Sequence, residues 1–574
     1  MTVGSDFILD ALVQEGLTHL FLVPGGLVDP FLPALARQTQ LQPIVAAHEG
    51  GAAYMADGYA RASGHFGAVL GIGGPGLCNM ATAIAAAKTD SSPVLALSGE
   101  VPIDMEGLGE FQDASQATLK DTAVVKPLTR MSMTVVSARN LHHWLRHALT
   151  AMWGMPRGPV HLSLTRDVLV GECTSEYAPV SAYYKALATL DRPAAEAALA
   201  LLVKAAGPKI AFLAGAGVEH DDGAATLRAV AEQWSIPVAT TLRAKGVFPE
   251  DHELSLGVFG YAGTRHATAA ILDSNIDVLI VLGSGFNERD TMHWTLREQA
   301  DAETIILHVN TDMDELTAHS VPAHSVLGTC HGFLDLMQEH AAALEPALLP
   351  GVAQRQAWLA KIKQEPRLYD IENCSKQTKP IHPAAAVAAL RKVFPRDGIM
   401  LVDSGAHRAF AGHYWSSYEP RTYISATNLG PMGWAIPAAV GVQCARPDRR
   451  VAVITGDGCM LMHGLEVQTA ARYGLPILYV VLNNGALGNV WLRAHQLGAL
   501  PSELTTIPDH DWAGFARSLG AQGFTVTDPA DLQGVFQKAL AANGPVLIDV
   551  KADKNCPTPV YDFAAGVKAW SYHE

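Results

Sequence analysis

Val451-Ala-Val-Ile-Thr-Gly456-Asp457-Gly458 and, further on, Leu475-Pro-Ile-Leu-Tyr-Val-Val-Leu482-Asn483-Asn484 are the two stretches that decide the fold. Each begins with an apolar run of strand length, which predicts a buried strand of a parallel sheet. Residues 462–473 between them have the apolar spacing of a helix. An acid and an amide therefore follow two strands that a crossover helix connects, at the carboxyl edge where open parallel sheets bind their ligands.

The polar groups at these strand ends suggest a metal site. One carboxylate, one amide oxygen and a nearby backbone carbonyl suit a hard divalent cation whose remaining ligands are phosphate oxygens. The sequence thus predicts a clamped diphosphate. The alternative is an ordinary strand–helix–strand unit whose polar ends arose by chance.

The pattern resembles the binding motif for thiamin diphosphate (ThDP), in which Gly-Asp-Gly is followed by Asn-Asn after a spacer of this length; here the spacer has 24 residues. The resemblance implies that Mg²⁺ is held by Asp457, Asn484 and the carbonyl of Ala486. It also places Gly456, Gly458 and Cys459 at the diphosphate, with the cysteine as a structural residue rather than a nucleophile.

Glu49 is the candidate catalytic residue of the N-terminal part. It follows a short predicted strand, residues 43–47, and opens a helix of small residues. In ThDP enzymes the matching glutamate hydrogen-bonds N1′ of the aminopyrimidine and promotes its imino form, which removes the proton from C2 of the thiazolium. A carboxylate can hold a proton in a partly apolar pocket. The alternative is an acid at a helix N-terminus that the macrodipole stabilises.

Further loops resemble segments of the same enzymes, in the same order. The resemblance places Pro24, Gly25, Gly26 and Pro75 at the cofactor, Gly430 and Met432 at the aminopyrimidine, and Ala406 and His407 near the diphosphate. Met432 would wedge between the two cofactor rings, or it fills the core. His407 could equally be an ordinary loop histidine. The chain is identified as a member of the ThDP-dependent superfamily, of the acetohydroxyacid (acetolactate) synthase and pyruvate oxidase type.

The alternation of strands and helices predicts an α/β fold with three doubly wound parallel-sheet domains. We expect a pyrimidine-binding domain at 1–180, a central Rossmann-like domain at 190–345, a diphosphate- and Mg-binding domain at 375–555, and a tail at 556–574. Residues 169–190 and 345–380 look like linkers. The aromatic tail either folds over the active site or packs on its own domain.

The central domain has a poor dinucleotide fingerprint. Gly215-Ala-Gly217 follows a predicted strand, but His220 stands where the third glycine belongs. Relatives carry FAD, an ADP moiety or nothing in this domain, so FAD is an option that the sequence does not favour. Asp312 either holds a ribose or is a solvated loop acid.

Two regions bear on the substrate. Phe111, Gln112 and Lys126 keep the order of acetohydroxyacid synthase positions with a different spacing; Gln112 is a candidate catalytic group that contacts the substrate, or a plain loop amide. Those enzymes have a tryptophan nine residues after the second motif asparagine. Arg493 stands there, with Trp491 two residues earlier. Arg493 would bind a carboxylate or phosphate of an unusual substrate, or it is an exposed helix residue.

The composition excludes several classes of protein. A net charge of −15 argues against a nucleic-acid partner. Seven scattered cysteines argue against a disulfide framework or zinc site and favour the cytoplasm. Neither a signal peptide nor a membrane span is predicted. The resemblance further implies a homodimer or homotetramer with active sites between subunits.

Three functions remain open. The favoured one is ThDP- and Mg-dependent cleavage or formation of C–C bonds in 2-keto acids, by an acetolactate-synthase-like carboligase or decarboxylase, hence a transferase or a lyase. A second is a ThDP-dependent lyase or decarboxylase acting on acyl-CoA or 2-hydroxyacyl substrates. The third is a non-catalytic ThDP-binding homologue.

Overall fold

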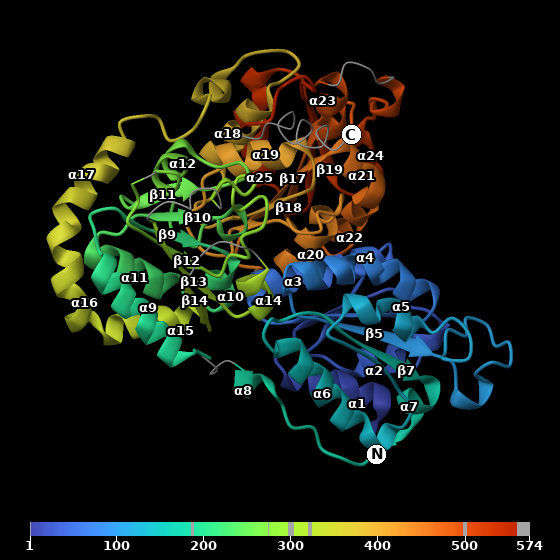
Figure 1. The fold of residues 1–574 in the computed structure, drawn as a ribbon. Helices are drawn as coiled ribbons and strands as arrows, with labels where there is room; N and C mark the ends of the chain where they lie inside the picture. The colour runs from blue at the N-terminus through green and yellow to red at the C-terminus, as the bar shows by residue number, and fades with distance from the viewer. Residues whose placement is uncertain are drawn as a thin grey trace, which may run out of the picture.

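Three parallel six-stranded sheets, each covered by helices, make up the part of the chain that the structure describes (Figure 1). The computed structural model describes residues 2–559 except 185–188, 274, 297–303, 319–323 and 497–501. The predicted fold class is confirmed. Our expectations for the tail beyond residue 559 lie outside the described residues, and the domain boundaries stay a prediction.

The first sheet has the strand order β3-β2-β4-β5-β7-β6. Its strands are β2 His19–Leu22, β3 Gln42–Val45, β4 Gly67–Ile72, β5 Val94–Glu100, β6 Met131–Val135 and β7 Val160–Thr165. Its helices are α1 Gly4–Gln14, α2 Phe31–Arg37, α3 Glu49–Ser63, α4 Pro75–Thr89, α5 Asp121–Val125, α6 Leu141–Trp153 and α7 Arg166–Val170. Helices α1, α2 and α6 cover one face of this sheet and form a core within the domain. Helices α3 and α4 cover the other face, where the core is shared with the C-terminal domain.

The central sheet has the order β11-β10-β9-β12-β13-β14. Its strands are β9 Ile210–Ala214, β10 Val238–Thr240, β11 Ser255–Val258, β12 Val278–Leu282, β13 Ile305–Asn310 and β14 His324–Leu327. Its helices are α9 Arg192–Ala205, α10 Ala216–His220, α11 Ala224–Trp234, α12 Arg265–Ile271, α14 Met313–Thr317 and α15 Cys330–Glu339.

The two segments predicted as linkers contain regular structure. Within 345–380, the end of α16 (Ala341–Leu348) and the whole of α17 (Val352–Ile362) are helical, because Leu348, Trp358 and Leu359 pack into the central core. These helices form the outer rim in Figure 1. Within 169–190, β8 (Glu172–Cys173) pairs antiparallel with β1 (Thr2–Val3), and the short α8 (Ser181–Tyr184) follows.

The third sheet has the order β16-β15-β17-β18-β20-β19. Its strands are β15 Ile399–Val402, β16 Tyr423–Ile424, β17 Val451–Gly456, β18 Ile477–Asn483, β19 Gln522–Val526 and β20 Val546–Lys551. Its helices are α18 Pro383–Val393, α19 Ala406–Tyr414, α20 Ala435–Ala445, α21 Asp457–His463, α22 Val467–Arg472, α23 Gly488–Gln496, α24 Trp512–Ser518 and α25 Leu532–Leu540.

The decisive stretch forms neighbouring parallel strands, with Val451 opposite Ile477, as predicted. The crossover between them differs from the single helix expected over 462–473. Helix α21 begins earlier, at Asp457, and a 3-10 turn, η8 (Gly464–Glu466), separates it from α22. Gly464, a poor helix former, stands at the break.

Helices α3 and α20 join the N- and C-terminal domains by direct backbone contact (Figure 1). A Cβ on Gly58 would lie 2.2 Å from the carbonyl oxygen of Ala438, and a Cβ on Gly441 would lie 1.8 Å from that of Met55. Only glycine permits so close a crossing. The helix that begins at Glu49 is therefore fixed against the C-terminal domain.

Candidate cofactor site

The carboxyl ends of β17 and β18 bring Asp457, Asn484 and Ala486 together. The Asp457 carboxylate accepts N–H groups from Gly458 at 2.8 Å, Gly485 at 2.7 Å and Ala486 at 3.3 Å. The Asn484 side-chain oxygen accepts the Ala486 N–H at 3.1 Å. Burial raises the pKa of Asp457 despite these donors. A cation at this corner would stabilise the charged form.

A cavity of about 280 Å³ opens beside this corner. All of its lining residues belong to the C-terminal domain. They include these predicted residues: Ala406, His407, Gly430, Met432, Gly456, Asp457, Gly458, Cys459, Asn484, Ala486 and Arg493. The structure thus gathers the predicted metal and diphosphate residues, and Met432 with them, around one space.

Two lining residues of this cavity have unpartnered polar atoms. His407 Nε2 and Asn489 Oδ1 are buried and have no hydrogen-bond partner. Burial, aided by the nearby Arg408 charge, lowers the pKa of His407 to about 3, so its imidazole is neutral and can donate one N–H. Asn489 was not predicted from the sequence, although it lies only five residues beyond Asn484.

These residues fit a magnesium diphosphate. Asp457, Asn484 and the Ala486 carbonyl would hold the metal, and His407 would donate to a phosphate oxygen. Among the described residues no three His, Cys, Asp or Glu side chains gather as a metal site. Phosphate oxygens of the diphosphate would be further ligands of the metal.

Cys459 and Met432 have packing roles at this cavity. The Cys459 thiol donates to the Ser404 carbonyl at 3.3 Å, and burial raises its pKa well above its ordinary value, which makes it a poor nucleophile. Met432 contacts the core with part of its side chain. A Cβ on Gly458 would lie 2.9 Å from the Met432 methyl carbon, so the glycine leaves room for it at the cavity.

Helix α23 borders the cavity with one predicted residue and turns the other away. Trp491 is 7% exposed; its indole N–H donates to Asn555 at 3.3 Å, and Lys554 lies 4.0 Å over its ring. It is not among the lining residues, whereas Arg493 and Lys554 are. The lining of the cavity therefore carries two basic side chains, of which only Arg493 was predicted from the sequence.

The predicted N-terminal residues lie at the carboxyl edge of the first sheet. Glu49 is the first residue of α3, and Asn79 donates to its carboxylate at 2.9 Å. A Cβ on Gly76, next to Pro75, would lie 3.6 Å from Glu49 Oε1, and one on Gly25 would touch Ile72, the last residue of β4. Pro24 and Gly26 flank Gly25 at the surface.

The remaining predicted substrate residues follow β5. Gln112 has a φ of 64° and its carbonyl lies near Gly74. Phe111 is 81% exposed, and Lys126 is exposed in the 3-10 turn η3 (Lys126–Leu128). Neither these residues nor Glu49 line the 280 Å³ cavity of the same chain.

Two buried acids at this edge were not predicted from the sequence. Glu100 Oε2 and Asp121 Oδ2 have no hydrogen-bond partner, and both lie within 3.5 Å of where a Cβ on Gly73 would be. Burial raises the pKa of Glu100 to about 7 and that of Asp121 to about 6. An acid ending the apolar run of β5 is the sequence feature that could have revealed Glu100.

The central sheet edge does not fit a flavin dinucleotide. The Gly217 N–H donates to Gly283 at 3.0 Å and the Gly215 N–H to Leu282 at 2.7 Å, so the glycine turns satisfy each other. A Cβ on Gly217 would lie 2.6 Å from the Gly283 Cα. The space along these turns is about 50 Å³, and its lining contains two arginines, Arg157 and Arg243, beside four acids, Asp221, Asp290, Asp312 and Glu315. An ADP diphosphate would find little room there.

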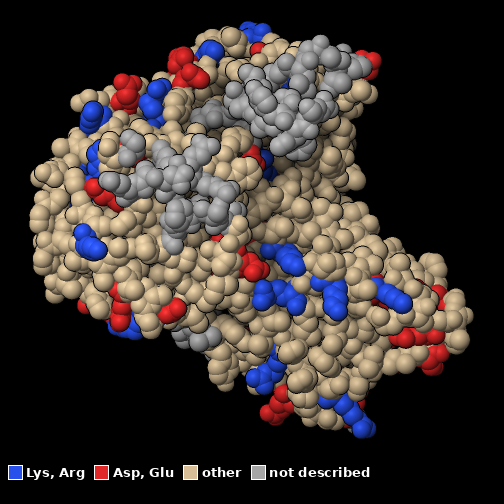
Figure 2. All heavy atoms as spheres, in the orientation of Figure 1, with Lys and Arg blue, Asp and Glu red and all other residues tan. Residues whose placement is uncertain are grey.

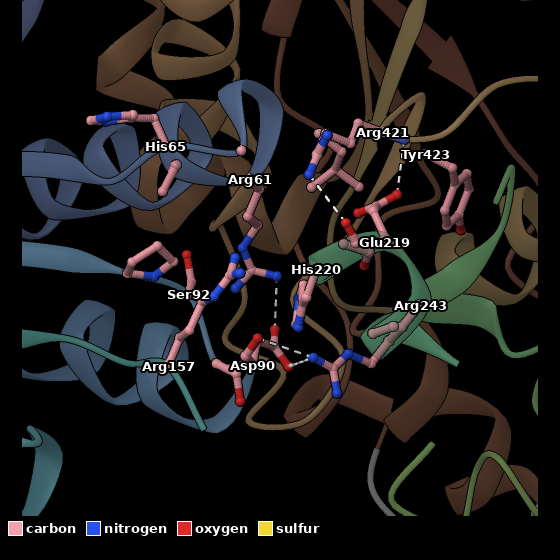
Figure 3. A pocket seen from close by; sticks show the side chains of 17 residues that line it. Arg61, His65, Asp90, Ser92, Arg157, Glu219, His220, Arg243, Arg421 and Tyr423 are labelled. Atoms are coloured by element: carbon pink, nitrogen blue, oxygen red, sulfur yellow. Dashed lines mark hydrogen bonds and ion pairs between the residues drawn. The ribbon is translucent and has the colours of Figure 1, made fainter. Parts of the chain in front are cut away.

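Beside this edge, an ion-pair cluster joins all three domains (Figure 3). Asp90 of the N-terminal domain pairs with Arg61 at 2.9 Å and with Arg243 of the central domain at 3.6 Å. The backbone N–H of Arg421, from the C-terminal domain, donates to Glu219 at 2.8 Å. The cavity left among these residues measures about 60 Å³. The cluster fixes the three domains relative to one another.

Comparison with known families agrees with this site. Three family models match: the N-terminal TPP binding domain of thiamine pyrophosphate enzymes at residues 2–122, their central domain at 195–337 and their C-terminal TPP binding domain at 403–550. This chain belongs to the thiamine pyrophosphate enzyme family. Thiamine pyrophosphate is another name for ThDP, so the predicted superfamily is confirmed.

Relatives of similar length carry acetolactate synthase names. A Methanocaldococcus jannaschii protein named probable acetolactate synthase large subunit is 33% identical, over 96% of this chain and 92% of its own length. The acetolactate synthase large subunits of Parasynechococcus marenigrum and Corynebacterium glutamicum are 32% and 31% identical, over 88% and 86% of their lengths and 96% and 95% of this chain. In the described part of the chain, no helix is long and apolar enough to span a membrane.

Proposed function

We propose that this protein is a ThDP- and Mg²⁺-dependent enzyme that forms or cleaves C–C bonds of 2-keto acids, as an acetolactate-synthase-like carboligase or decarboxylase. The corner of Asp457, Asn484 and Ala486 on its cavity carries this proposal, because it supplies oxygen ligands for one metal and leaves the rest to a diphosphate. The names of the relatives support the substrate class.

The residues have separate tasks in this reaction. Bound ThDP supplies a carbanion nucleophile and an electron sink for decarboxylation. Asp457, Asn484 and the Ala486 carbonyl would hold the metal, and His407 would donate to the diphosphate. Met432 would contact the cofactor rings. Glu49 would exchange a proton with the aminopyrimidine N1′, and Asn79, which donates to Glu49 Oε2, orients its carboxylate.

The active site requires two copies of the chain. Glu49 is absent from the lining of the cavity beside Asp457, which supports the proposal that the two halves of the site within one chain face different spaces. Both halves expose apolar side chains: Leu108 (75%) and Phe111 (81%) after β5, Leu461 (56%) in α21 and Leu465 (58%) in η8. A second copy would cover these side chains and bring its Glu49 to this cavity. We therefore propose a homodimer, or a tetramer built from such dimers.

The charges on the surface and the state of the cysteines bear on the enzyme's partners and its location in the cell. Figure 2 shows small separate groups of acidic and basic side chains on a mostly uncharged face, which supports a small-molecule substrate rather than a nucleic acid. All seven cysteines are unpaired, which supports our proposal of a cytoplasmic location.

The proposal is tested by NMR of ¹³C-pyruvate incubated with the protein, ThDP and Mg²⁺. Acetolactate or acetoin would establish a carboligase, and acetaldehyde alone a decarboxylase. Glu49→Gln should abolish turnover. If neither pyruvate nor bulkier 2-keto acids are consumed, the proposal is wrong. Turnover of acyl-CoA substrates would then favour the lyase, and turnover of no substrate the non-catalytic homologue.

A further inference from the structure

The turn that presents Glu49 is held by side chains of the C-terminal domain of its own chain. Strand β3 ends at Val45. From this residue onward, three backbone N–H groups point across the domain boundary. The Val45 N–H donates to the Tyr473 hydroxyl at 2.8 Å, the Ala47 N–H to Glu466 Oε2 at 3.1 Å and the His48 N–H to Glu466 Oε1 at 3.2 Å. Glu49 follows directly.

Glu466 is built into this contact. Its side chain is buried, with 1% of the residue exposed, and Thr469 donates its hydroxyl to Oε2 at 2.6 Å. A Cβ on Gly51 would lie 2.0 Å from Oε1, so the first turn of α3 packs directly on the carboxylate. Both oxygens thus accept hydrogen bonds in a place that water does not reach. Burial raises the pKa of Glu466, against the effect of its hydrogen-bond donors.

The same segment carries the metal residue. Asp457 starts α21 and Glu466 ends the 3-10 turn η8, with continuous helical structure between them. His463 of α21 adds ring contacts to His48, with centroids 6.0 Å apart, and to Tyr54, at 5.3 Å. The change from α-helix to 3-10 turn at Gly464 therefore directs Glu466 toward the end of β3 in the N-terminal domain.

We propose that Glu466 is a positioning residue for Glu49: by accepting the N–H groups of Ala47 and His48, it fixes the place from which Glu49 reaches the aminopyrimidine. This inference rests on the proposed function. Glu466 acts through backbone N–H groups. It lies at the contact between the N- and C-terminal domains of one chain, where α3 and α20 also pack, so it positions the Glu49 of its own chain. Neither it nor Thr469 lines the cavity of the metal corner.

Glu466→Gln is the informative substitution because it keeps the size and removes one acceptor. An amide has one oxygen and one NH₂ group, so one of the two backbone N–H groups would face a donor. The turn would have to shift to relieve this buried mismatch. A misplaced carboxylate transfers protons less efficiently, and errors of about 1 Å reduce rates by about 100-fold.

The first measurement is amide hydrogen exchange of the cofactor-free protein. In Glu466→Gln the peptide containing residues 45–50 should exchange at least about tenfold faster than in the wild type, because its N–H groups lose their acceptor. Glu372→Gln changes an exposed glutamate of the 3-10 turn η7 (Ile371–Ser375), which packs on α18 of the C-terminal domain, and should leave this peptide unchanged. Equal exchange in Glu466→Gln and wild type would overturn the inference.

The second measurement is the exchange rate of the C2 proton of bound ThDP, followed by NMR after an acid quench, together with ThDP affinity. We expect Glu466→Gln to slow C2 exchange by about tenfold to 100-fold while the ThDP dissociation constant changes less than about threefold. A purely structural role would weaken both together. If Glu49→Gln slows C2 exchange and Glu466→Gln does not, the positioning role is wrong and the proposed function stands. If Glu49→Gln has no effect, the proposed function itself fails.

A second variant keeps the test valid if Glu466→Gln does not fold. Thr469→Val removes only the hydroxyl that donates to Glu466 Oε2. It should slow C2 exchange in the same direction by a smaller factor, about threefold to tenfold, since the carboxylate loses one constraint but keeps both backbone donors. Unchanged C2 exchange in this folded variant would contradict the proposal.

Discussion

Asp457 shows how a short motif specifies chemistry at the scale of one residue. Its carboxylate is 2% exposed and receives backbone donors from both strand ends that the motif supplies. The residue types and their spacing were enough to predict this corner from the sequence, because both groups follow strands that pair directly. Glu466 was not predictable in this way. Its partners are backbone N–H groups more than 400 residues away, and backbone groups leave no trace in the sequence.

Asp457→Asn should weaken Mg²⁺-dependent ThDP binding by about 100-fold or more, because a neutral amide cannot replace the charged ligand of a divalent cation. Calorimetric titration of ThDP at fixed Mg²⁺ measures this. Asp553→Asn changes another acid of the same cavity and should bind ThDP within about threefold of the wild type. Similar losses in both variants would mean that the cavity charge matters and not the metal corner.

Glu100 should make stability fall with rising pH. Burial raises its folded-state pKa from 4.5 to about 7, so the folded protein binds a proton that the unfolded chain releases. The free energy of unfolding therefore declines as the pH rises through this interval and stays lower above it. Glu100→Gln should stabilise the protein at pH 8 by about 1 to 2 kcal/mol relative to its effect at pH 4.5. Thermal unfolding of both proteins at the two pH values tests the sign; a constant difference would contradict it.

At the scale of elements, the strands followed their apolar runs closely and the connections did not. Strands β17 and β18 lie within a few residues of the predicted runs, because a buried strand needs only a short apolar sequence. The crossover was expected as one helix, and the structure breaks it at Gly464 to carry Glu466. Residues 352–362 were expected as a linker since their polar composition hides the few residues, Trp358 and Leu359, that pack on the central core.

The crossing of α3 and α20 gives a prediction for these elements. Gly58→Ala should destabilise the protein by about 2 kcal/mol or more, because the new methyl group would meet the Ala438 carbonyl. Gly534→Ala, in the first turn of α25 where nothing lies within 4 Å of a Cβ, should stabilise it by about 0.5 to 1 kcal/mol. Opposite shifts of the thermal midpoint are expected, and a stabilised Gly58→Ala would show that the two helices do not pack as described.

At the scale of the whole molecule, we propose that one chain holds two half-sites rather than one site. The segment from Asp457 to Glu466 serves the metal corner at one end and its own chain's Glu49 turn at the other. The sequence motifs predicted both halves, and the resemblance implied active sites between subunits. The structure adds that Glu49 is absent from the lining of the cavity beside Asp457, whereas which copy completes which cavity stays a prediction.

Mixed dimers test this arrangement directly. Glu49→Gln and Asp457→Asn subunits, each inactive alone, should regain activity when they are unfolded together and refolded. In a mixed dimer one site combines both defects and the other combines two intact halves. Random pairing makes half of the dimers mixed, so about a quarter of wild-type turnover should return.

A mixture of Glu49→Gln with Glu49→Gln,Asp457→Asn subunits is the control and should stay inactive, since no pairing creates an intact site. Recovery to about a quarter in the first mixture alone would place each site between two chains. If neither mixture recovers although wild-type protein refolds under the same conditions, Glu49 and Asp457 must act within one chain. The exposed apolar side chains after β5 and in α21 and η8 would then need another partner.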